Sequence, residues 1–329
     1  MYFCTVGKIV SLQQAITILQ NGGLVAIPTE TVYGLAANAL NLNSVENIYK
    51  SKGRPSNNPL ILHFNEWKDA EPFVQNVPED FFKLYAKFSP GPISYLLPKS
   101  ALVSEKISAK NTTVAIRFPS HPIAKALLNE LNFPLAAPSA NPSGYISPTQ
   151  SHHVLQQLGD KIDGVLEGGE CAKGIESTIV GWDENGEIVI YRLGTITAVE
   201  IEKVLEKPVK VLTGEHKKIV APGMLSKHYS PQKPTYITKD LRGKIHQFSE
   251  KKIGIIWQIK PDVFDLNDCI NLSFSDNGNL EIIAKNLYKT MYKIDNLDVD
   301  VILIEQCLEG ELGLAIADRL SRAGINLDI

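Results

Sequence analysis

The sequence contains a series of short apolar runs, each closed by a proline, a glycine or a polar cluster. Residues 24–27 form one such run, which ends at Pro28, and residues 60–64 form another directly after Pro59. Runs of this length are typical of buried strands, because helices in globular proteins are usually longer. They alternate with segments of helical spacing, such as residues 12–19, and the connecting turns are short. This alternation predicts an α/β fold with a large mixed sheet.

The alternation stops at residues 213–234 and then begins again. This segment contains Pro222 and Pro231 and has no periodic apolar pattern, which is typical of an ordered linker. After it, residues 253–257 and 299–304 are predicted to be buried strands, with helices at residues 279–293 and 311–323. We therefore predict a large domain at residues 1–212, a linker at 213–234, and a smaller α/β domain with a mostly parallel sheet at 235–329.

Composition limits the classes of partner. The formal charge of −3 over 329 residues excludes a general attraction to nucleic acid or to an anionic membrane, so any basic surface must be local. No apolar run reaches the length that spans a bilayer, and the N-terminus lacks the pattern of a signal peptide. The four cysteines are far apart, which favours reduced thiols over disulfides or zinc ligands. We therefore expect a cytoplasmic protein.

Two loops have the composition of an anion-binding site. The first carries Lys52 and Arg54, two residues apart, followed by Asn58. The second carries Ser139 and Asn141 between two prolines that stiffen the turn. Cations beside preordered hydroxyl and amide groups suit a phosphate or a carboxylate. For the first loop taken alone, a solvated basic turn is the alternative interpretation.

Further polar residues follow predicted strands. Residues 29–33 add two hydroxyls, a carboxylate and a phenol after the strand at 24–27. Arg117 and Arg192 lie near the ends of two other predicted strands. His63 lies inside a strand, where a lone histidine is usually structural. Ser147 precedes a proline and is predicted to cap a helix at its N-terminus.

Several common catalytic motifs are missing. The sequence has no Walker A loop, no G-x-G-x-x-G after a strand and no G-x-S-x-G elbow. His152 and His153 have no acidic partner at metal-ligand spacing, so we expect a solvent-facing pair on a helix. What remains is a set of cations and hydroxyls without a nucleophile. Such a site acts by positioning reactants and neutralising charge.

At this point the sequence resembles the YrdC-like domain of L-threonylcarbamoyladenylate synthase, in its long two-domain form. The signature of that family is a Lys-x-Arg pair with a Ser-x-Asn pair, here Lys52-x-Arg54 and Ser139-x-Asn141. Further matching segments occur in the same order along the chain, at residues 28–35, 58–60, 174–178, 221–224, 228–231 and 313–320. One departure is Leu225, where many long forms carry a basic residue after the Pro-Gly-Met of the linker.

The resemblance implies a fold and a reaction. The fold would be a YrdC-like twisted mixed sheet with a concave basic cavity, followed by a smaller Rossmann-like α/β domain. The reaction would join L-threonine, bicarbonate or carbon dioxide, and ATP into threonylcarbamoyl-AMP, releasing pyrophosphate. A separate transferase would then modify tRNAs that read codons beginning with A, next to the anticodon. Mg²⁺ would accompany ATP, and no organic cofactor is expected.

The resemblance also assigns roles to residues. Lys52 and Arg54 would be catalytic, stabilising charge on the phosphates. The residues that would hold L-threonine are Thr31, His63, Arg117, Ala137 (through its backbone) and Ser177. The residues that would hold ATP are Arg54, Asn58, Thr113, Ser139, Asn141, Ser147, Arg192 and Tyr229. We expect Arg54 to lie on an exposed loop, and the linker with Met224, Leu225, His228 and Tyr229 to cover the cavity.

Two other functions stay open. YrdC-like domains also form carbamoyladenylate in hydrogenase maturation, although the zinc-finger and acylphosphatase segments of those proteins are missing from this sequence. A double-stranded-RNA-binding factor is the alternative from another class, and weak RNA binding would need a local basic patch. Arg242, Lys244, Lys251 and Lys252 cluster in sequence, but a solvated loop explains them equally.

Overall fold

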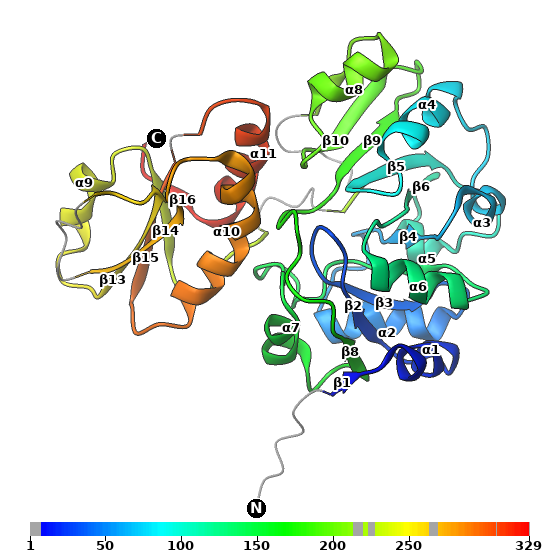
Figure 1. The fold of residues 1–329 in the computed structure, drawn as a ribbon, viewed down its shortest axis with the longest axis horizontal. Helices are drawn as coiled ribbons and strands as arrows, with labels where there is room; N and C mark the ends of the chain where they lie inside the picture. The colour runs from blue at the N-terminus through cyan, green and yellow to red at the C-terminus, as the bar shows by residue number, and fades with distance from the viewer. Residues whose placement is uncertain (1–7, 213–219, 223–227, 263–268, 307, 329) are drawn as a thin grey trace, which may run out of the picture.

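The computed structural model describes residues 8–212, 220–222, 228–262, 269–306 and 308–328. Two sheets organise it (Figure 1). We call residues 8–212, which contain the larger sheet, the large-sheet region, and residues 235–328, which contain the smaller sheet, the small-sheet region. Both combine strands with helices, so the predicted α/β class is confirmed.

The larger sheet has eleven strands in the order β1-β8-β2-β3-β7-β4-β6-β5-β9-β10-β11. It is mixed, as predicted, since β4 runs parallel to β6 while β5 runs antiparallel to β6. The strands are β1 (Ile9–Val10), β2 (Val25–Ile27), β3 (Gly34–Asn38), β4 (Ile61–His63), β5 (Ile93–Pro98), β6 (Thr113–Arg117), β7 (Leu135–Ala136), β8 (Gly164–Leu166), β9 (Thr178–Trp182), β10 (Ile188–Arg192) and β11 (Lys210–Val211). Apolar side chains from both faces fill the core beneath the flanking helices.

The helices of this region begin and end at recognisable caps. Ser11 forms a capping box with Gln14 at the start of α1, and Gly53 closes α2 in the left-handed conformation. The helical pattern at residues 66–88 is interrupted, because two prolines divide it into three short helices. The helices are α1 (Leu12–Gln20), α2 (Leu42–Lys52), α3 (Trp67–Ala70), η1 (Glu71–Phe73), α4 (Glu79–Phe88), α5 (Glu105–Ser108), α6 (Pro122–Glu130), α7 (Ser151–Leu158) and α8 (Ala198–Leu205).

Two local predictions near α7 are wrong. Ser147 does not cap this helix, which begins at Ser151. The Ser147 hydroxyl instead donates to the Glu176 carboxylate at 2.6 Å. His153 is not solvent-facing, because it is buried with its ring 4.2 Å from that of Tyr292. Both differences have the same cause. The side chains meet groups far away in the sequence, and local patterns carry no information about them.

The smaller sheet has five strands, and every pairing in it is parallel, as predicted. Its order is β14-β13-β15-β12-β16. A Rossmann order would place the first strand beside the second. Here β15 lies between them, so the sheet is parallel, as in that fold, but its strand order differs from the Rossmann order. The elements are β12 (Thr235–Thr238), α9 (Leu241–Lys244), η2 (Ile245–Phe248), β13 (Ile253–Ile259), β14 (Ile270–Ser275), α10 (Leu280–Asp295), β15 (Val301–Glu305), α11 (Glu311–Ala323) and β16 (Ile325–Asn326).

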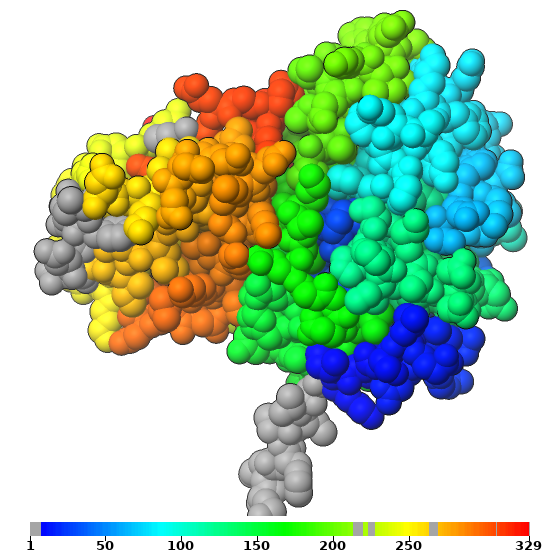
Figure 2. Space-filling model, in the orientation of Figure 1, coloured from blue at the N-terminus to red at the C-terminus, as the bar shows by residue number. Residues whose placement is uncertain are grey.

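Helices α10 and α11 lie between the smaller sheet and the large-sheet region (Figure 1). Their apolar faces share one buried cluster with Val32, Ile146 and Ile175 of the large-sheet region. In the space-filling view, the orange atoms of α10 meet the green atoms of the large-sheet region directly (Figure 2). Gly174 marks the closest approach: a Cβ there would lie 2.4 Å from the carbonyl oxygen of Ala284 in α10, and its φ of +77° favours glycine. The two regions are therefore packed together through α10 and α11.

Candidate active site

A cavity of about 500 Å³, partly open to solvent, lies in the large-sheet region, next to its contact with α10 and α11. Its polar side chains come from the turn between β2 and β3, the loop after α2, the ends of β4, β6 and β10, the loops after β7 and before β9, and residues 228–229. The strand ends bring these groups together because β4 and β6 are neighbours, and β7 adjoins β4. The described residues that line the cavity are Thr29, Val32, Gly34, Arg54, Ile61, His63, Arg117, Ala137, Pro138, Ser139, Glu176, Arg192, Pro222, His228 and Tyr229.

Arg117 has a carboxylate partner. Its Nη2 donates to Glu30 Oε1 at 2.6 Å and to the Thr31 hydroxyl at 2.8 Å. Glu30 also accepts the backbone N–H of Ser120 at 3.0 Å. Burial alone would raise the pKa of Glu30, but the Arg117 guanidinium outweighs it and holds that pKa below its ordinary value. This side of the cavity therefore carries a balanced pair of charges.

His63 lies beside Arg117, since the two residues are paired in register between β4 and β6. Burial and the nearby Arg117 charge lower the pKa of His63 to about 3. Its imidazole is therefore neutral near pH 7, with Nδ1 3.2 Å from the carbonyl oxygen of Ile61. A neutral ring can exchange hydrogen bonds with a ligand but cannot act as a cationic anchor.

Arg54 is buried rather than exposed, which corrects the expectation from its loop sequence. Only 8% of its surface is accessible. Its guanidinium donates to the Asn58 backbone carbonyl at 3.1 Å, the Asn58 side-chain oxygen at 2.6 Å and the Pro59 carbonyl at 2.7 Å. The loop folds around its own arginine because these oxygens satisfy the charge locally. Burial lowers the pKa of Arg54 to about 10, so it stays cationic near pH 7.

Lys52 joins the two predicted loops but does not line the cavity. It occupies the last turn of α2, and its Nζ donates to the carbonyl of Ser139 at 2.6 Å and to that of Asn141. Burial and the Arg54 charge hold its pKa well below the ordinary value. The Lys-x-Arg and Ser-x-Asn pairs are therefore adjacent in space. Lys52 fixes the backbone of the second loop, and Arg54 faces the cavity.

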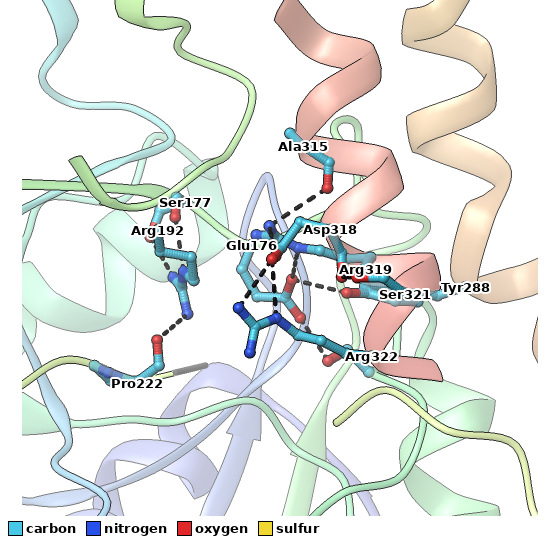
Figure 3. A network of polar contacts seen from close by, with 11 residues as sticks. Glu176, Ser177, Arg192, Pro222, Tyr288, Ala315, Asp318, Arg319, Ser321 and Arg322 are labelled. Carbon is cyan, nitrogen blue, oxygen red and sulfur yellow. Dashed lines mark hydrogen bonds and ion pairs between the residues drawn. The ribbon is translucent and has the colours of Figure 1, made fainter. Parts of the chain in front are cut away.

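Arg192 comes from the end of β10. Its Nε donates to the Ser177 carbonyl at 3.0 Å, Nη2 to the Ser177 hydroxyl at 3.0 Å, and Nη1 to the Pro222 carbonyl at 3.2 Å (Figure 3). The Ser177 hydroxyl also lies 2.8 Å from that of Ser94. Burial lowers the pKa of Arg192. Like Arg54, it bonds to uncharged oxygens.

Glu176 was not among the predicted site residues, yet it lines the cavity. Its carboxylate accepts from the Ser147 hydroxyl at 2.6 Å, the Tyr288 hydroxyl at 2.8 Å and Arg319 Nε at 3.3 Å (Figure 3). Burial would raise its pKa, but Arg319 and then Arg192 hold that pKa below its ordinary value. Its position beside Ser177 in sequence was the available signal. Arg319 lies in the matching segment 313–320, but nothing local in the sequence identifies Glu176 as its partner.

His228 and Tyr229 close part of the cavity wall. Both are buried, with ring centroids 4.0 Å apart, and Tyr229 has a left-handed backbone with a φ of +64°. Burial lowers the pKa of His228 to about 3 and raises that of Tyr229 to about 12, so both are neutral near pH 7. Met224 and Leu225, which we expected beside them, lie outside the described residues.

The structure sorts the predicted residues into three groups. Seven line the cavity: Arg54, His63, Arg117, Ala137, Ser139, Arg192 and Tyr229. Six bond to lining residues or to their loops: Thr31, Lys52, Asn58, Asn141, Ser147 and Ser177. Thr113 stands apart. It begins β6, four residues before Arg117, and is therefore about 13 Å away along the strand.

Several buried polar atoms in and around the cavity lack a hydrogen-bond partner among the described residues. They are Asn58 Nδ2, Arg117 Nε, Asn141 Oδ1, His228 Nδ1 and Arg319 Nη2. Buried polar groups are usually paired, and exceptions gather where a ligand or water completes them. The same part of the chain has no group of three or more His, Cys, Asp or Glu placed to hold a metal ion. The unpartnered Arg117 Nε and Asn58 Nδ2 are therefore donors available to an acceptor group of a ligand.

Fold and site together define an α/β protein with a cationic cavity that binds and positions its ligands. The family model described as "Telomere recombination" (Sua5/YciO/YrdC) matches residues 17–194. The model described as "Threonylcarbamoyl-AMP synthase, C-terminal domain" matches residues 196–324.

Relatives agree over nearly the whole chain. The threonylcarbamoyl-AMP synthase of Pyrococcus abyssi is 39% identical, with 93% of this chain and 91% of the relative covered. That of Bacillus subtilis is 37% identical, with 95% and 92% covered. The crystal structure of P. abyssi Sua5 complexed with L-threonine superposes with a TM-score of 0.88 at 37% identity, covering 96% of each chain. The chain belongs to the threonylcarbamoyl-AMP synthase family. Among its described residues, no helix is long and apolar enough to cross a bilayer.

Proposed function

We propose that the chain forms threonylcarbamoyl-AMP and pyrophosphate from L-threonine, bicarbonate or carbon dioxide, and ATP. One observation carries the proposal. A single cavity has a charge-balanced side, with Arg117 and Glu30, and a cationic side, with Arg54 and Arg192 bonded to uncharged oxygens. The first side suits a zwitterionic amino acid and the second a polyanionic nucleotide.

Threonine is assigned to the balanced side. Arg117 Nε has no partner among the described residues and can take the threonine carboxylate. The N–H of Ala137 already donates to Ile61 at 3.0 Å, so its carbonyl oxygen is the group left for the threonine ammonium. The neutral imidazole of His63 can exchange a hydrogen bond with the threonine hydroxyl. Thr31, bonded to Arg117, completes this side, and Ser177, bonded to Arg192, is the proposed threonine contact next to the cationic side.

ATP is assigned to the cationic side. Arg54 and Arg192 offset phosphate charge, and Ser139 and Tyr229 line the same part of the cavity wall. Asn58 accepts a hydrogen bond from Arg54, the Asn141 carbonyl accepts one from Lys52, and the Ser147 hydroxyl donates to Glu176 in the cavity wall. We keep Thr113 in the nucleotide set only as a prediction from the family resemblance. Lys52 acts in this proposal by fixing the carbonyls of the Ser-x-Asn loop, and Arg54 is the cation nearest the phosphates.

The proposed chemistry needs no covalent enzyme intermediate. The threonine ammonium first loses a proton to solvent. The free amine then adds to carbon dioxide and releases a second proton, or adds to bicarbonate with loss of water, and either route gives a carbamate. A carbamate oxygen then attacks the α-phosphorus of ATP, and pyrophosphate leaves with the electron pair of the broken P–O bond. Negative charge grows on the phosphates, where Arg54 and Arg192 can stabilise it. Mg²⁺ would be carried by the triphosphate oxygens, consistent with the lack of a three-residue metal cluster among the described residues.

The domain limits stay part of the proposal: a catalytic domain at residues 1–212, a connection at 213–234 and a second domain at 235–329. Within the connection, Pro222, His228 and Tyr229 line the cavity. We propose that they exclude water from the mixed anhydride, which hydrolyses readily. The product would pass to a transferase that modifies tRNA in the cytoplasm.

The test measures pyrophosphate release and product identity with threonine, bicarbonate or ATP omitted in turn. Release should require all three, and mass spectrometry should detect threonylcarbamoyl-AMP. Equal release without threonine would overturn the proposal. Tight, salt-sensitive RNA binding without turnover would instead favour the RNA-binding alternative.

A further inference from the structure

We propose that Arg319, in the small-sheet region, is a positioning residue for the nucleotide side of the cavity. It neutralises the Glu176 carboxylate in the cavity wall and supports the ring of Tyr229. The small-sheet region would then complete the active site rather than merely adjoin it. This inference rests on the proposed ATP-dependent reaction.

The position of Arg319 is unusual for a charged side chain. It is 0% exposed, although it lies on α11 and enters the contact between the two regions. Its Nε donates to Glu176 at 3.3 Å, and its Nη1 lies 3.1 Å from Asp318 (Figure 3). Its guanidinium carbon lies 5.6 Å from the centre of the Tyr229 ring, which permits a cation–π contact. One side chain thus touches two residues that line the cavity.

Glu176 needs this cation because of where it lies. A carboxylate in the wall of a site for triphosphate would repel the ligand unless a positive charge offset it. Glu176 accepts hydrogen bonds from Ser147 and Tyr288, but these hydroxyls are neutral. Arg192 is the other nearby cation, and it donates hydrogen bonds to Ser177 and Pro222. Without Arg319, Glu176 would therefore draw on the charge that Arg192 offers to phosphate.

A role limited to holding the regions together explains the geometry less well. Other contacts across the same interface join them away from the cavity: Tyr145 donates to Asp295 at 2.7 Å, and Lys289 pairs with Glu170 at 2.8 Å. These pairs involve no cavity-lining residue. Arg319 and Tyr288, by contrast, both reach Glu176, and Tyr288 also stacks on Tyr229 at 5.5 Å. The contacts directed at the cavity are therefore distinct from those that only join the regions.

The experiment is a double-mutant cycle in the full-length chain, with Arg319→Met, Glu176→Gln and both together. Steady-state pyrophosphate release is measured while ATP and threonine are varied separately. Arg319→Met should raise the KM for ATP by about tenfold or more, with the KM for threonine changed less than about twofold. Glu176→Gln in the same chain should recover most of that loss, because it removes the uncompensated charge.

Two further variants keep the test decisive if Arg319→Met folds poorly. Tyr288→Phe removes one hydroxyl from Glu176 and should raise the KM for ATP about threefold with little change in melting temperature. Lys289→Met is the matched control across the same interface: its side chain pairs with Glu170 and touches no residue that lines the cavity, so the KM for ATP should not change.

The outcomes separate the two proposals. Wild-type chain that releases no pyrophosphate with all three substrates would overturn the proposed function. Active wild type with an unchanged KM for ATP in Arg319→Met would overturn the role of Arg319. So would equal rises in both KM values accompanied by a lowered melting temperature that Glu176→Gln fails to repair, since these describe a purely structural residue.

Discussion

The arginines on the two sides of the cavity have different hydrogen-bond partners. Arg117 is paired with a carboxylate, Glu30, at 2.6 Å. Arg54 and Arg192 are also buried, but they donate hydrogen bonds to carbonyl, amide and hydroxyl oxygens. A neutralised arginine can still orient a carboxylate through its remaining N–H group, whereas an arginine held by dipoles keeps its full charge for a polyanion. The difference explains how one cavity can accept both a zwitterion and a triphosphate.

The largest effect should come from the cationic side. Arg54→Ala is expected to lower kcat/KM for ATP about 100- to 1,000-fold, the range found when a preorganised donor is removed from a developing charge. It should also lower stability by about 2 kcal/mol, because three buried oxygens lose their donor. Steady-state kinetics and urea unfolding measure the two effects. Unchanged ATP kinetics would end the assignment of this side to nucleotide.

On the balanced side, loss of the cation should harm folding first. Arg117→Met would leave Glu30 buried without its ion pair, which costs about 3 kcal/mol. Adding Glu30→Gln should restore most of that stability while the KM for threonine stays raised. Denaturant unfolding of the single and double variants measures the change in stability, and steady-state kinetics measures the KM for threonine. If the double variant regained normal threonine affinity, Arg117 would not be the carboxylate anchor.

Much of the site was predictable because each loop carries its chemistry locally. Lys52, Arg54, Ser139 and Asn141 were identified from types and spacing, and the structure brings their loops together through hydrogen bonds of Lys52. The burial of Arg54 was not predictable, since its partners depend on how the loop folds back.

The contacts that reach the cavity across the interface could not be predicted from local sequence patterns. Arg319 and Glu176 are 143 residues apart in sequence, and no periodicity marks either as a partner. The Ser147 cap was mispredicted for the same reason, because the hydroxyl found a distant carboxylate. The alternation of strands and helices was sufficient for the fold class, but the strand order of the small-sheet region depends on crossovers that composition does not encode.

A smaller effect is expected where the wall covers the cavity. Tyr229→Ala should reduce formation of intact threonylcarbamoyl-AMP about tenfold, because it opens the wall to water and removes the ring beside Arg319. The ratio of intact product to pyrophosphate, followed by mass spectrometry, distinguishes leakage from slow chemistry. A variant with wild-type rate and yield would show that this wall is not needed.

The smallest effect concerns one histidine on each side. His63 and His228 have folded pKa values of about 3, whereas an unfolded histidine titrates near 6.5. Between these values the unfolded chain binds more protons, so stability falls as pH falls from about 6.5 towards 3. Each histidine should contribute a loss of about 0.7 kcal/mol between pH 7 and 6. His228→Gln should remove its share of that slope in urea unfolding, and an identical slope would contradict its burial as a neutral ring.

Substitution of Gly174 would alter the distance between the two regions without altering the polar groups of the cavity. Its missing side chain lets the loop before β9, which carries Glu176 and Ser177, lie against the backbone of α10, with no space for one more carbon. A methyl group there would push the loop and α10 apart without changing a charge or removing a hydrogen-bond donor. Replacement by alanine and then by valine would increase the separation between the two regions in steps. The activity of each variant would then show how much separation the reaction tolerates.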